Sequence, residues 1–258
     1  MNKLQIELGT HHGSAELARG ISLAIPLQFD GPQPNFFAAP PASAAPLQAD
    51  GFTGDTHQGG SCNVGRYQLV PHCNGTHTEC VGHIVDDAVA VTEQLHQSLL
   101  PATLVTIAPR HNVIDAALIK MSLQHHPLRE LHTAFIIRTL PNSKEKLSHR
   151  YDQVPPAYLA EDAVMLLVEA GVEHLLVDLP SLDPMHDAGR LAAHRAFWGL
   201  PAGSRRKQDA KRPRSTVTEM IYVPDQIKDG YYLLDLQIPA FMSDAAPSRP
   251  IIYPLEMR

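Results

Sequence analysis

Residues 71–83 read Pro71-His72-Cys73-Asn74-Gly75-Thr76-His77-Thr78-Glu79-Cys80-Val81-Gly82-His83, which places three imidazoles, two thiols and a carboxylate within one short stretch. Surface loops more often carry Lys, Ser and Glu, and buried strands carry Val and Ile, so this composition fits neither. Imidazoles, thiols and carboxylates bind metal ions and carry protons. The stretch therefore predicts a chemical site around which the rest of the chain is organised.

Cys73, His77 and Glu79 have a spacing that fits a metal site. If the chain is extended after His77, then His77 and Glu79 project to the same side. Gly75 would let the backbone turn, so that Cys73 reaches the same ion. Thiolate and imidazole ligands favour zinc, whereas a carboxylate also accepts manganese or iron. Three protein ligands with an open position are typical of a catalytic metal, which lowers the pKa of bound water to about 7.

Two other interpretations of the same stretch stay open. Cys73, His77 and Cys80 could form a structural zinc knot, although the paired spacings of such knots are missing. A cysteine nucleophile with a histidine base is also conceivable, but no oxyanion loop or helix start stands out beside either thiol.

The remaining pattern predicts a mixed α/β domain. Strands are expected where β-branched and aromatic residues alternate or run together, and helices where apolar residues recur every three or four positions. The expected strands are 21–27, 66–70, 104–107, 133–137, 174–178, 217–223, 231–238 and 251–253, and the expected helices are 88–99, 156–171 and 189–198. Strands at both ends and in the middle, with helices between them, favour one α/β domain over residues 1–258.

Two polar residues far from the stretch fall on apolar faces. In the helix expected at 189–198, Leu191, His194 and Trp198 share one side. By spacing alone, His194 is more often a satisfied core histidine than a metal ligand. Glu219 shares a strand face with Val217 and Ile221, so if that face is buried the carboxylate must be paired, protonated or bound to a metal.

Two segments lack a regular pattern. Residues 30–65 are rich in Pro, Ala and Gly and carry Phe36, Phe37 and Phe52. A loop of this length is usually a lid, a binding loop or an arm, and we expect its phenylalanines to cover an apolar or aromatic substrate. A basic loop follows at about 203–215, and we expect it to be solvated.

Composition and charge indicate the class of protein and of partner. The chain has 258 residues, is 44% hydrophobic and has a net charge of -6, which gives no reason to expect nucleic acid or an anionic membrane as partner. Three cysteines, Cys62, Cys73 and Cys80, do not form a dense disulfide framework. The first residues lack the apolar core of a signal peptide, and no run of eighteen apolar residues occurs. We therefore expect a soluble, cytoplasmic protein with a small-molecule substrate.

Four motifs together carry a resemblance to a known family. Gly75-Thr76-His77-x-Glu79-x-x-x-His83 resembles the His-x-Gly-Thr-His-x-Asp-x-Pro-x-His motif of the kynurenine formamidase-like "cyclase" family of metal-dependent hydrolases, which includes isatin hydrolases. Residues 21–27 are similar to the family's opening strand, and residues 177–183 to its Asp-x-x-Ser-(Ile/Leu/Val)-Asp segment. His194 and Glu219 fall where the family has a metal-binding histidine and glutamate. This chain has Cys73 and Glu79 where the family usually has His and Asp. His72, one residue earlier, would substitute for Cys73 only if the backbone shifted register.

The resemblance implies a single-domain, mixed-sheet swivelling β/β/α fold that forms homodimers or homotetramers. It implies a divalent metal, zinc first and manganese second, at Cys73, His77 and Glu79, and a second or shared position at Glu79, His194 and Glu219. Metal-activated water would be the nucleophile and His83 the proton carrier. The implied activity is hydrolysis of an amide, formamide or cyclic amide, at a C–N bond other than a peptide bond. The alternative is a catalytically altered member of the fold that binds a metal or small ligand.

Overall fold

A mixed β-sheet forms the centre of the computed structural model, which describes residues 3–257. Within these residues, eleven strands join this sheet. In spatial order they are β1 (Lys3–Leu8), β2 (His11–Glu16), β17 (Ile251–Met257), β15 (Gly230–Asp235), β9 (Leu99–Ile107), β11 (Ala134–Thr139), β13 (His174–Val177), β14 (Thr216–Glu219), β8 (His77–Glu79) and β16 (Ala245–Pro247), with β3 (Ile21–Ser22) beside β17.

The sheet has a parallel centre and antiparallel flanks. Strands β9, β11, β13 and β14 run parallel, whereas β15 and β8 pair antiparallel at either side of them. The central strands are buried on both faces, so they are runs of apolar residues rather than alternating ones. Phe135 and Ile137 of β11 pack on one face, and Ala134 and Ile136 on the other.

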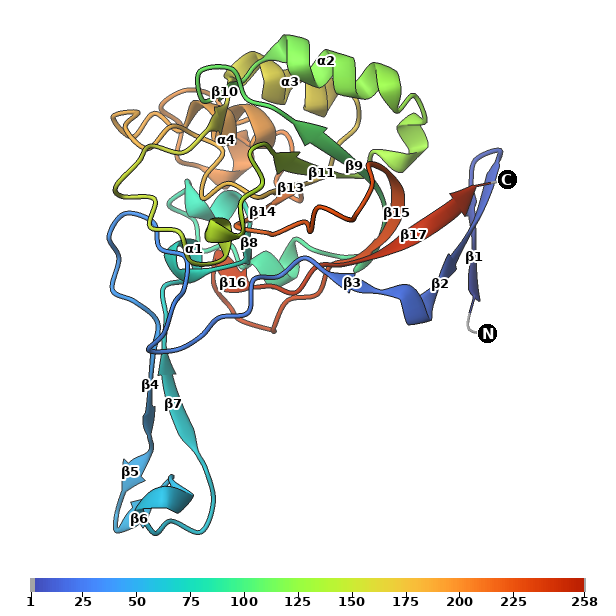
Figure 1. Cartoon of the computed structure of the whole chain (residues 1–258). Coiled ribbons are helices and arrows are strands. Elements are labelled where there is room, and N and C mark those ends of the chain that lie inside the picture. Colours follow the sequence, from blue (N-terminus) through green and yellow to red (C-terminus); the bar gives the residue numbers. More distant parts are fainter. Residues whose placement is uncertain (1–2, 258) are drawn as a thin grey trace.

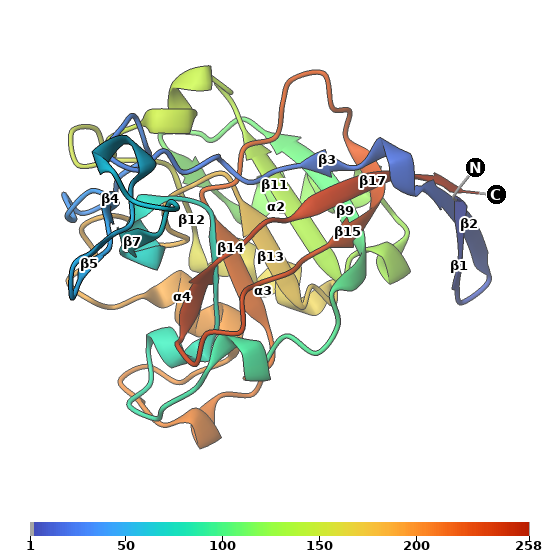
Figure 2. The ribbon, with the colours of Figure 1, turned by 90° about the horizontal axis from the view of Figure 1, so that it is seen from below.

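Helices cover one face of this sheet (Figures 1 and 2). They are α2 (Ala116–His125), α3 (Glu161–Glu169) and α4 (Ala192–Trp198). Ile119, Leu167 and Phe197 of these helices belong to one apolar cluster with Phe135 and Val177 of the sheet. The predicted α/β class is confirmed, and so are the strands and helices expected at 104–107, 133–137, 174–178, 156–171 and 189–198, with shorter bounds in the helices.

The sequence interpretation was wrong in one region and incomplete in others. The helix expected at 88–99 is only a short 3₁₀ turn, η4 (Val91–Glu93), and Leu99 already begins β9. Val91 and Leu95 pack into clusters on opposite faces of the sheet, so their helical spacing does not mark one helix face. Helix α2 was missed, although Asp115 caps it by accepting a hydrogen bond from the Leu118 N–H at 2.9 Å. The β1–β2 hairpin was also missed.

The segment expected to be an irregular loop is partly regular, and that expectation needs correction. Strands β4 (Ser43–Pro46) and β7 (Gly65–Gln68) pair into a two-stranded arm that projects from the body (Figure 1). At its tip β5 (Gln48–Ala49) pairs with β6 (Phe52–Thr53). Short two-residue strands alternate with Pro, Gly and Ala there, so neither the strand nor the helix period is visible in the sequence.

The basic loop at 203–215 is tied to the body by its own charges. Arg205 pairs with Asp86 of the body at 2.7 Å, whereas Arg206 pairs with Asp209 within the loop at 2.9 Å. Arg212 lies over the Phe197 ring and donates to the Phe197 carbonyl.

No helix in the described part of the chain combines the length and the apolar character needed to cross a membrane.

Candidate metal centre

Two paired strands, β8 and β14, form the support of the site. In their antiparallel register His77 lies opposite Glu219, and Glu79 lies opposite Val217. Side chains two apart on a strand share a face, so His77, Glu79 and Glu219 all project to the same side. The intervening Thr78 and Thr218 point to the other side, where their hydroxyls meet at 2.8 Å. The sequence prediction that His77 and Glu79 share a side is confirmed.

The three side chains on that face are almost completely buried, with His77, Glu79 and Glu219 exposed by 0%, 1% and 3%. Nδ1 of His77 lies 2.9 Å from the Gly75 carbonyl oxygen, which only accepts, so Nδ1 carries the hydrogen. The bare Nε2 then faces Oε2 of Glu219 at 3.5 Å. This tautomer is the one that a metal-binding imidazole needs.

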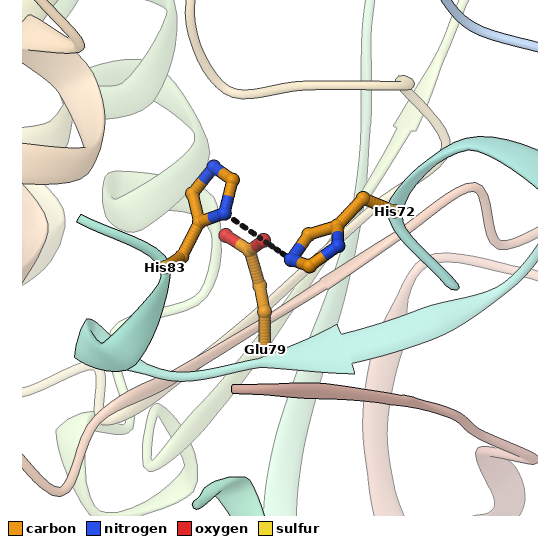
Figure 3. A group of neighbouring side chains, drawn as sticks. All are labelled: His72, Glu79 and His83. Carbon is orange, nitrogen blue, oxygen red and sulfur yellow. Dashed lines mark ion pairs between the residues drawn. The ribbon is translucent and has the colours of Figure 1, made fainter. Parts of the chain in front are cut away.

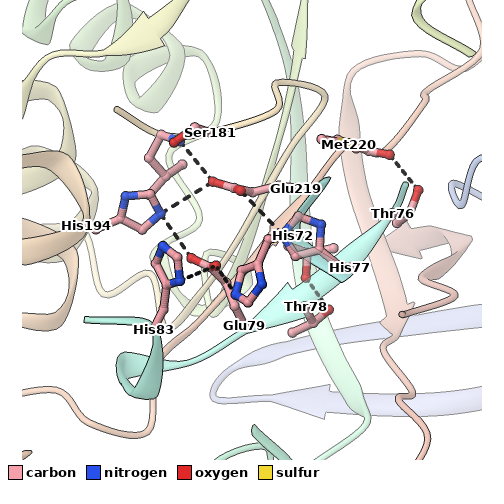
Figure 4. Close-up of polar contacts among 12 residues, drawn as sticks. His72, Thr76, His77, Thr78, Glu79, His83, Ser181, His194, Glu219 and Met220 are labelled. Atoms are coloured by element: carbon pink, nitrogen blue, oxygen red, sulfur yellow. Dashed lines mark hydrogen bonds and ion pairs between the residues drawn. The ribbon is translucent and has the colours of Figure 1, made fainter. Parts of the chain in front are cut away.

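Helix α4 brings His194 to the same point (Figure 4). Asp183 accepts hydrogen bonds from the Ala193 N–H at 2.7 Å and from His194 Nδ1 at 2.6 Å. The second ring nitrogen, Nε2, lies 3.0 Å from Oε1 of Glu79 and 3.4 Å from Oε1 of Glu219. A carboxylate behind a histidine is the usual support of a metal ligand, because it fixes the ring and its tautomer.

The donor atoms at this point lack partners of their own. Nε2 of His77, Nε2 of His194 and Oε1 of Glu79 are buried and have no hydrogen-bond partner among residues 3–257. Ligand atoms of His77, Glu79 and Glu219 lie within 4.8 Å of one another. Lone pairs and carboxylate oxygens that face each other in a buried site repel unless a proton or a cation lies between them. The donor set, imidazole nitrogen with carboxylate oxygen, fits a divalent transition metal.

A second group lies on the other side of Glu79 (Figure 3). Oε2 of Glu79 is 3.4 Å from Nε2 of His72 and 3.8 Å from Nδ1 of His83. Asp244, which immediately precedes β16, approaches the same two imidazoles at 3.0 and 3.8 Å. His72 comes from the short helix α1 (Pro71–Asn74) and His83 from the 3₁₀ turn η3 (Val81–His83). The proton carrier predicted at His83 is therefore in contact range of Glu79.

The two thiols of the stretch lie differently. Cys73 is half-buried, and its thiol belongs to neither group of converging ligand atoms. Burial, and then the charge of Glu219, raise the pKa of Cys73, so this thiol lies within electrostatic range of the buried group. Cys80 is buried, donates to the Val89 carbonyl at 3.6 Å, and burial raises its pKa to about 12. Cys80 is thus a neutral thiol, which disfavours both the zinc knot and a nucleophilic role for it.

Charge coupling across Glu79 links the two groups. Burial would raise the pKa of Glu79, but the charge of His83 and the contacts with His194 and His72 lower it below its usual range. The charge of Glu79 in turn raises the pKa of His83, against the effect of burial. His194 is buried, which lowers its pKa, yet Asp183, Glu219 and Glu79 together raise it well above its usual value. Glu79 is therefore the shared carboxylate of the whole site.

An apolar wall stands beside the buried group. Phe36, Tyr151 and Met220 form a small cluster, with Met185 against it. Met220 directly follows Glu219, and the Phe36 N–H donates to the Cys73 carbonyl at 3.1 Å, so this buried cluster is joined to the site segments through their backbone. Phe37 is 61% exposed, and Phe52 lies in the arm, away from the site (Figure 1). Of the three phenylalanines expected near a substrate, Phe36 is the one beside the site.

Sequence reasoning missed three polar residues of the site or gave them no role. Asp244 follows an irregular segment, and only the pairing of Ala245 with Glu79 brings it to the imidazoles. Asp183 belonged to the quoted 177–183 segment, but its role as partner of His194 depends on the fold of the loop before α4. His72 was considered only as a substitute for Cys73.

Comparison with known proteins gives consistent results. Residues 21–184 match the family described as "Putative cyclase". Kynurenine formamidase of Bacillus cytotoxicus is 27% identical over 201 residues, covering 77% of this chain and 83% of that protein. The Bacillus anthracis enzyme of the same name is 28% identical over 202 residues, with the same coverage. Isatin hydrolase A of Labrenzia aggregata shares the fold, with a TM-score of 0.62 at 14% identity over 91% of this chain and 93% of that one.

Proposed function

This chain belongs to the cyclase family, and from that premise we propose that it is a metal-dependent hydrolase of an amide, formamide or cyclic amide. Relatives named kynurenine formamidase and a structural neighbour named isatin hydrolase support a reaction at a C–N bond other than a peptide bond. The observation that carries the proposal is the convergence of four buried side chains, those of His77, Glu79, His194 and Glu219. Three of the facing atoms, Nε2 of His77, Nε2 of His194 and Oε1 of Glu79, have no hydrogen-bond partner among the described residues.

We propose that these four residues hold a divalent cation, with Cys73 as a further ligand predicted from the sequence. The half-buried Cys73 lies in the same 71–83 stretch as His77 and Glu79. Zinc is the preferred ion because imidazole and thiolate are among its usual ligands, and manganese is the second choice because of the two carboxylates. When bound, such an ion supplies a Lewis acid for the substrate carbonyl and an activated water at neutral pH.

The chain's own residues supply orientation and proton transfer. Asp183 and the Gly75 carbonyl hold the rings of His194 and His77, so their Nε2 atoms stay directed at the two carboxylates. We propose His83 as the proton carrier: its Nδ1 faces Glu79, and the charge of Glu79 raises its pKa. A protonated His83 could give its proton to the leaving nitrogen, which is the role of a general acid in amide hydrolysis.

The names of the relatives indicate the class of substrate. Kynurenine formamidase and isatin hydrolase are both named after aromatic compounds, which favours an aromatic group beside the scissile amide. We therefore propose an N-formyl aromatic amine or an isatin-like lactam as substrate, rather than a charged aliphatic amide.

Two further proposals concern assembly and location. We propose a homodimer or homotetramer, because the two-stranded arm projects from the body and exposes 61% of Tyr67, and an isolated two-stranded ribbon is only marginally stable in water. We propose the cytoplasm as location, because Cys62, Cys73 and Cys80 are all free thiols.

Metal analysis of purified protein tests the proposal. We expect at least one equivalent of zinc or manganese in the wild type, and a loss of most of it in His77→Ala and in Glu219→Ala. His126→Ala, which removes a histidine outside the site, is the matched control and should retain the metal. Hydrolysis of N-formylaniline and of isatin should follow the metal content. Unchanged metal content in both site variants would contradict the proposal, and metal binding without turnover of either compound would support the binding-protein alternative.

A further inference from the structure

A pocket of about 500 Å³ opens where the C-terminal halves of helices α2 and α3 lie side by side (Figure 1). Sites for small molecules usually have volumes of about 300–1,000 Å³ and a mostly apolar wall with a few polar groups. The lining residues that matter here come from α2, α3 and the segment before β11, and they are Lys120, Leu123, Arg129, His132, Leu166 and Glu169. The size and the mixed lining of this pocket fit a small organic ligand.

The pocket lies at the opposite edge of the sheet from the metal centre. His132 precedes β11, and β11, β13 and β14 run parallel, so their amino ends share one edge. Glu219 is the last residue of β14, at the carboxyl edge. Its neighbour Thr218 is level with Ile136, four residues beyond His132, which corresponds to roughly 13 Å along the strands. A ligand in the pocket therefore does not contact the residues of the metal centre.

The wall of the pocket is apolar and its mouth is basic. Leu123 and Leu166 are half-buried and pack against the core cluster that includes Phe135. Lys120 and Arg129 are exposed, and neither forms an ion pair among the described residues. Arg129 donates one N–H to a backbone carbonyl of α3, which leaves further donors of its guanidinium for a ligand.

The charge of the lining favours an anion. Lys120 and Arg129 supply two positive charges and Glu169 supplies one negative charge, so the lining has an excess of one positive charge in a chain whose net charge is -6. Guanidinium and ammonium groups form their strongest hydrogen bonds with carboxylates and phosphates. With only one charge in excess, a monocarboxylate matches the mouth better than a doubly charged phosphate.

A buried histidine with an unused nitrogen belongs to the same lining. His132 is 1% exposed, and its Nε2 lies 2.8 Å from the His126 carbonyl oxygen, so Nε2 carries the hydrogen. Nδ1 is then a bare acceptor, and it is buried without a hydrogen-bond partner among residues 3–257. Burial lowers the pKa of His132, which keeps the ring neutral near pH 7. An acceptor in this state is costly to leave unpaired, and an N–H or O–H of a ligand would pair it.

We propose that this pocket binds an aromatic ring that carries a carboxylate at one end and an amino or hydroxyl group at the other. The carboxylate pairs with Lys120 and Arg129 at the exposed mouth, and the ring lies between Leu123 and Leu166. The amino or hydroxyl group donates to Nδ1 of His132. Because the cations are exposed and the acceptor is buried, the two polar groups belong at opposite ends of the ligand, and a rigid ring holds them there at little entropic cost. The simplest compound of this class is 4-aminobenzoate.

Isothermal titration calorimetry of the purified protein with 4-aminobenzoate tests the site. We expect saturable binding of one molecule per chain. Benzoate lacks the N–H donor and should bind about 2- to 10-fold more weakly, the value of one neutral hydrogen bond. The double variant Lys120→Gln, Arg129→Gln should lose about tenfold in affinity, since an exposed ion pair contributes about 2- to 5-fold.

Occlusion of the pocket should have a larger effect than removal of its charges. Leu166→Trp fills the space between the two helices and should abolish measurable binding. Met165→Trp is the matched control, because Met165 is 51% exposed and lies outside this lining, so this variant should bind as the wild type does. His77→Ala, which alters the metal centre, should also bind as the wild type does. Circular dichroism melting of each variant checks that it is folded.

Three results would overturn the inference: no saturable binding to the wild type, wild-type affinity in either folded Leu166→Trp or the double variant, or loss of binding in His77→Ala. The last result would place the ligand at the metal centre. Equal affinities for benzoate and 4-aminobenzoate would exclude the contact with His132. Binding in this pocket does not require catalysis, so failure of the proposed hydrolysis would leave all of these outcomes unchanged.

Discussion

The candidate site has two halves that stand on different supports. His77, Glu79 and Glu219 stand on the paired strands β8 and β14, where register fixes their spacing and burial leaves their side chains 0–4% exposed. His72 and His83 stand on single helical turns, α1 and η3, and their side chains are 25% and 29% exposed. A sheet holds ligands at fixed distances, whereas short turns at the surface tolerate rotation.

This difference separates what each half can do. The sheet-borne half is suited to hold a cation tightly, because its donors are positioned before any ion arrives. The turn-borne half is suited to exchange of a proton at His83. Glu79 belongs to both, with Oε1 near His194 and Oε2 near His72 and His83.

Replacement of Glu79 should have the largest effect on zinc binding, because both halves of the site share this carboxylate. In Glu79→Gln the shared carboxylate charge is lost to both halves, so zinc binding should weaken by more than the roughly 100-fold that loss of an outer partner costs. Zinc titration of the stripped protein measures this. Glu93→Gln, an exposed glutamate in η4, is the control and should bind zinc as the wild type does. Zinc binding of wild-type strength in Glu79→Gln would show that Glu79 is not a ligand of the centre.

Replacement of Asp183 should weaken zinc binding by the buried group, through the loss of its contact with His194. In Asp183→Asn the His194 ring loses the carboxylate at 2.6 Å that fixes its tautomer, so zinc binding should weaken by about 10- to 100-fold. Asp187→Asn is a close control, since Asp187 accepts from the Gly189 and Leu191 N–H groups in the same loop but does not contact His194. Equal weakening in both variants would mean that the loop, rather than the His194 contact, is responsible.

Acid should lower the stability of the fold at the strand pairing next to the sheet-borne half. Burial, and then the charge of Arg212, lower the pKa of His174 to about 4, and its ring meets Thr216 at 2.8 Å where β13 pairs with β14. Between that value and the ordinary pKa near 6.5, the unfolded chain binds a proton that the folded chain does not, so stability falls as pH falls.

From pH 7 to pH 5 this one group should lower the free energy of unfolding by about 2 kcal/mol. Urea unfolding of metal-stripped protein at the two pH values measures the loss. His174→Gln should reduce the pH dependence by that amount, whereas His57→Gln, at an exposed position in the arm, should leave it unchanged. If the free energy of unfolding of His174→Gln depends on pH as that of the wild type does, His174 is not the group responsible.

The sheet-borne half was accessible to sequence reasoning because strands have a period of two. That rule alone predicted the common face of His77 and Glu79, and it placed Glu219 on an apolar face; helical spacing placed His194 beside Leu191 and Trp198. The central strands were accessible too, since burial on both sides makes them continuous apolar runs. The meeting of His194 and Glu219 with the first stretch came from the family resemblance rather than from spacing.

The turn-borne half was not accessible, because no period describes it. Whether His72 or Cys73 faces Glu79 depends on the single turn of α1, and Asp244 reaches the imidazoles only through the pairing of β16 with β8. The helix expected at 88–99 failed for a related reason: Val91 and Leu95 bury on opposite faces of the sheet. Local spacing cannot distinguish such a segment from an amphipathic helix.

Anomalous X-ray diffraction at the zinc edge, from crystals of the zinc-loaded protein, tests the central claim most directly. The account predicts an anomalous peak surrounded by His77, Glu79, His194 and Glu219, and that peak should be absent in His77→Ala crystals grown under the same conditions. A zinc-loaded protein without a peak among these four residues, or with its strongest peak elsewhere, would contradict the assignment of this centre.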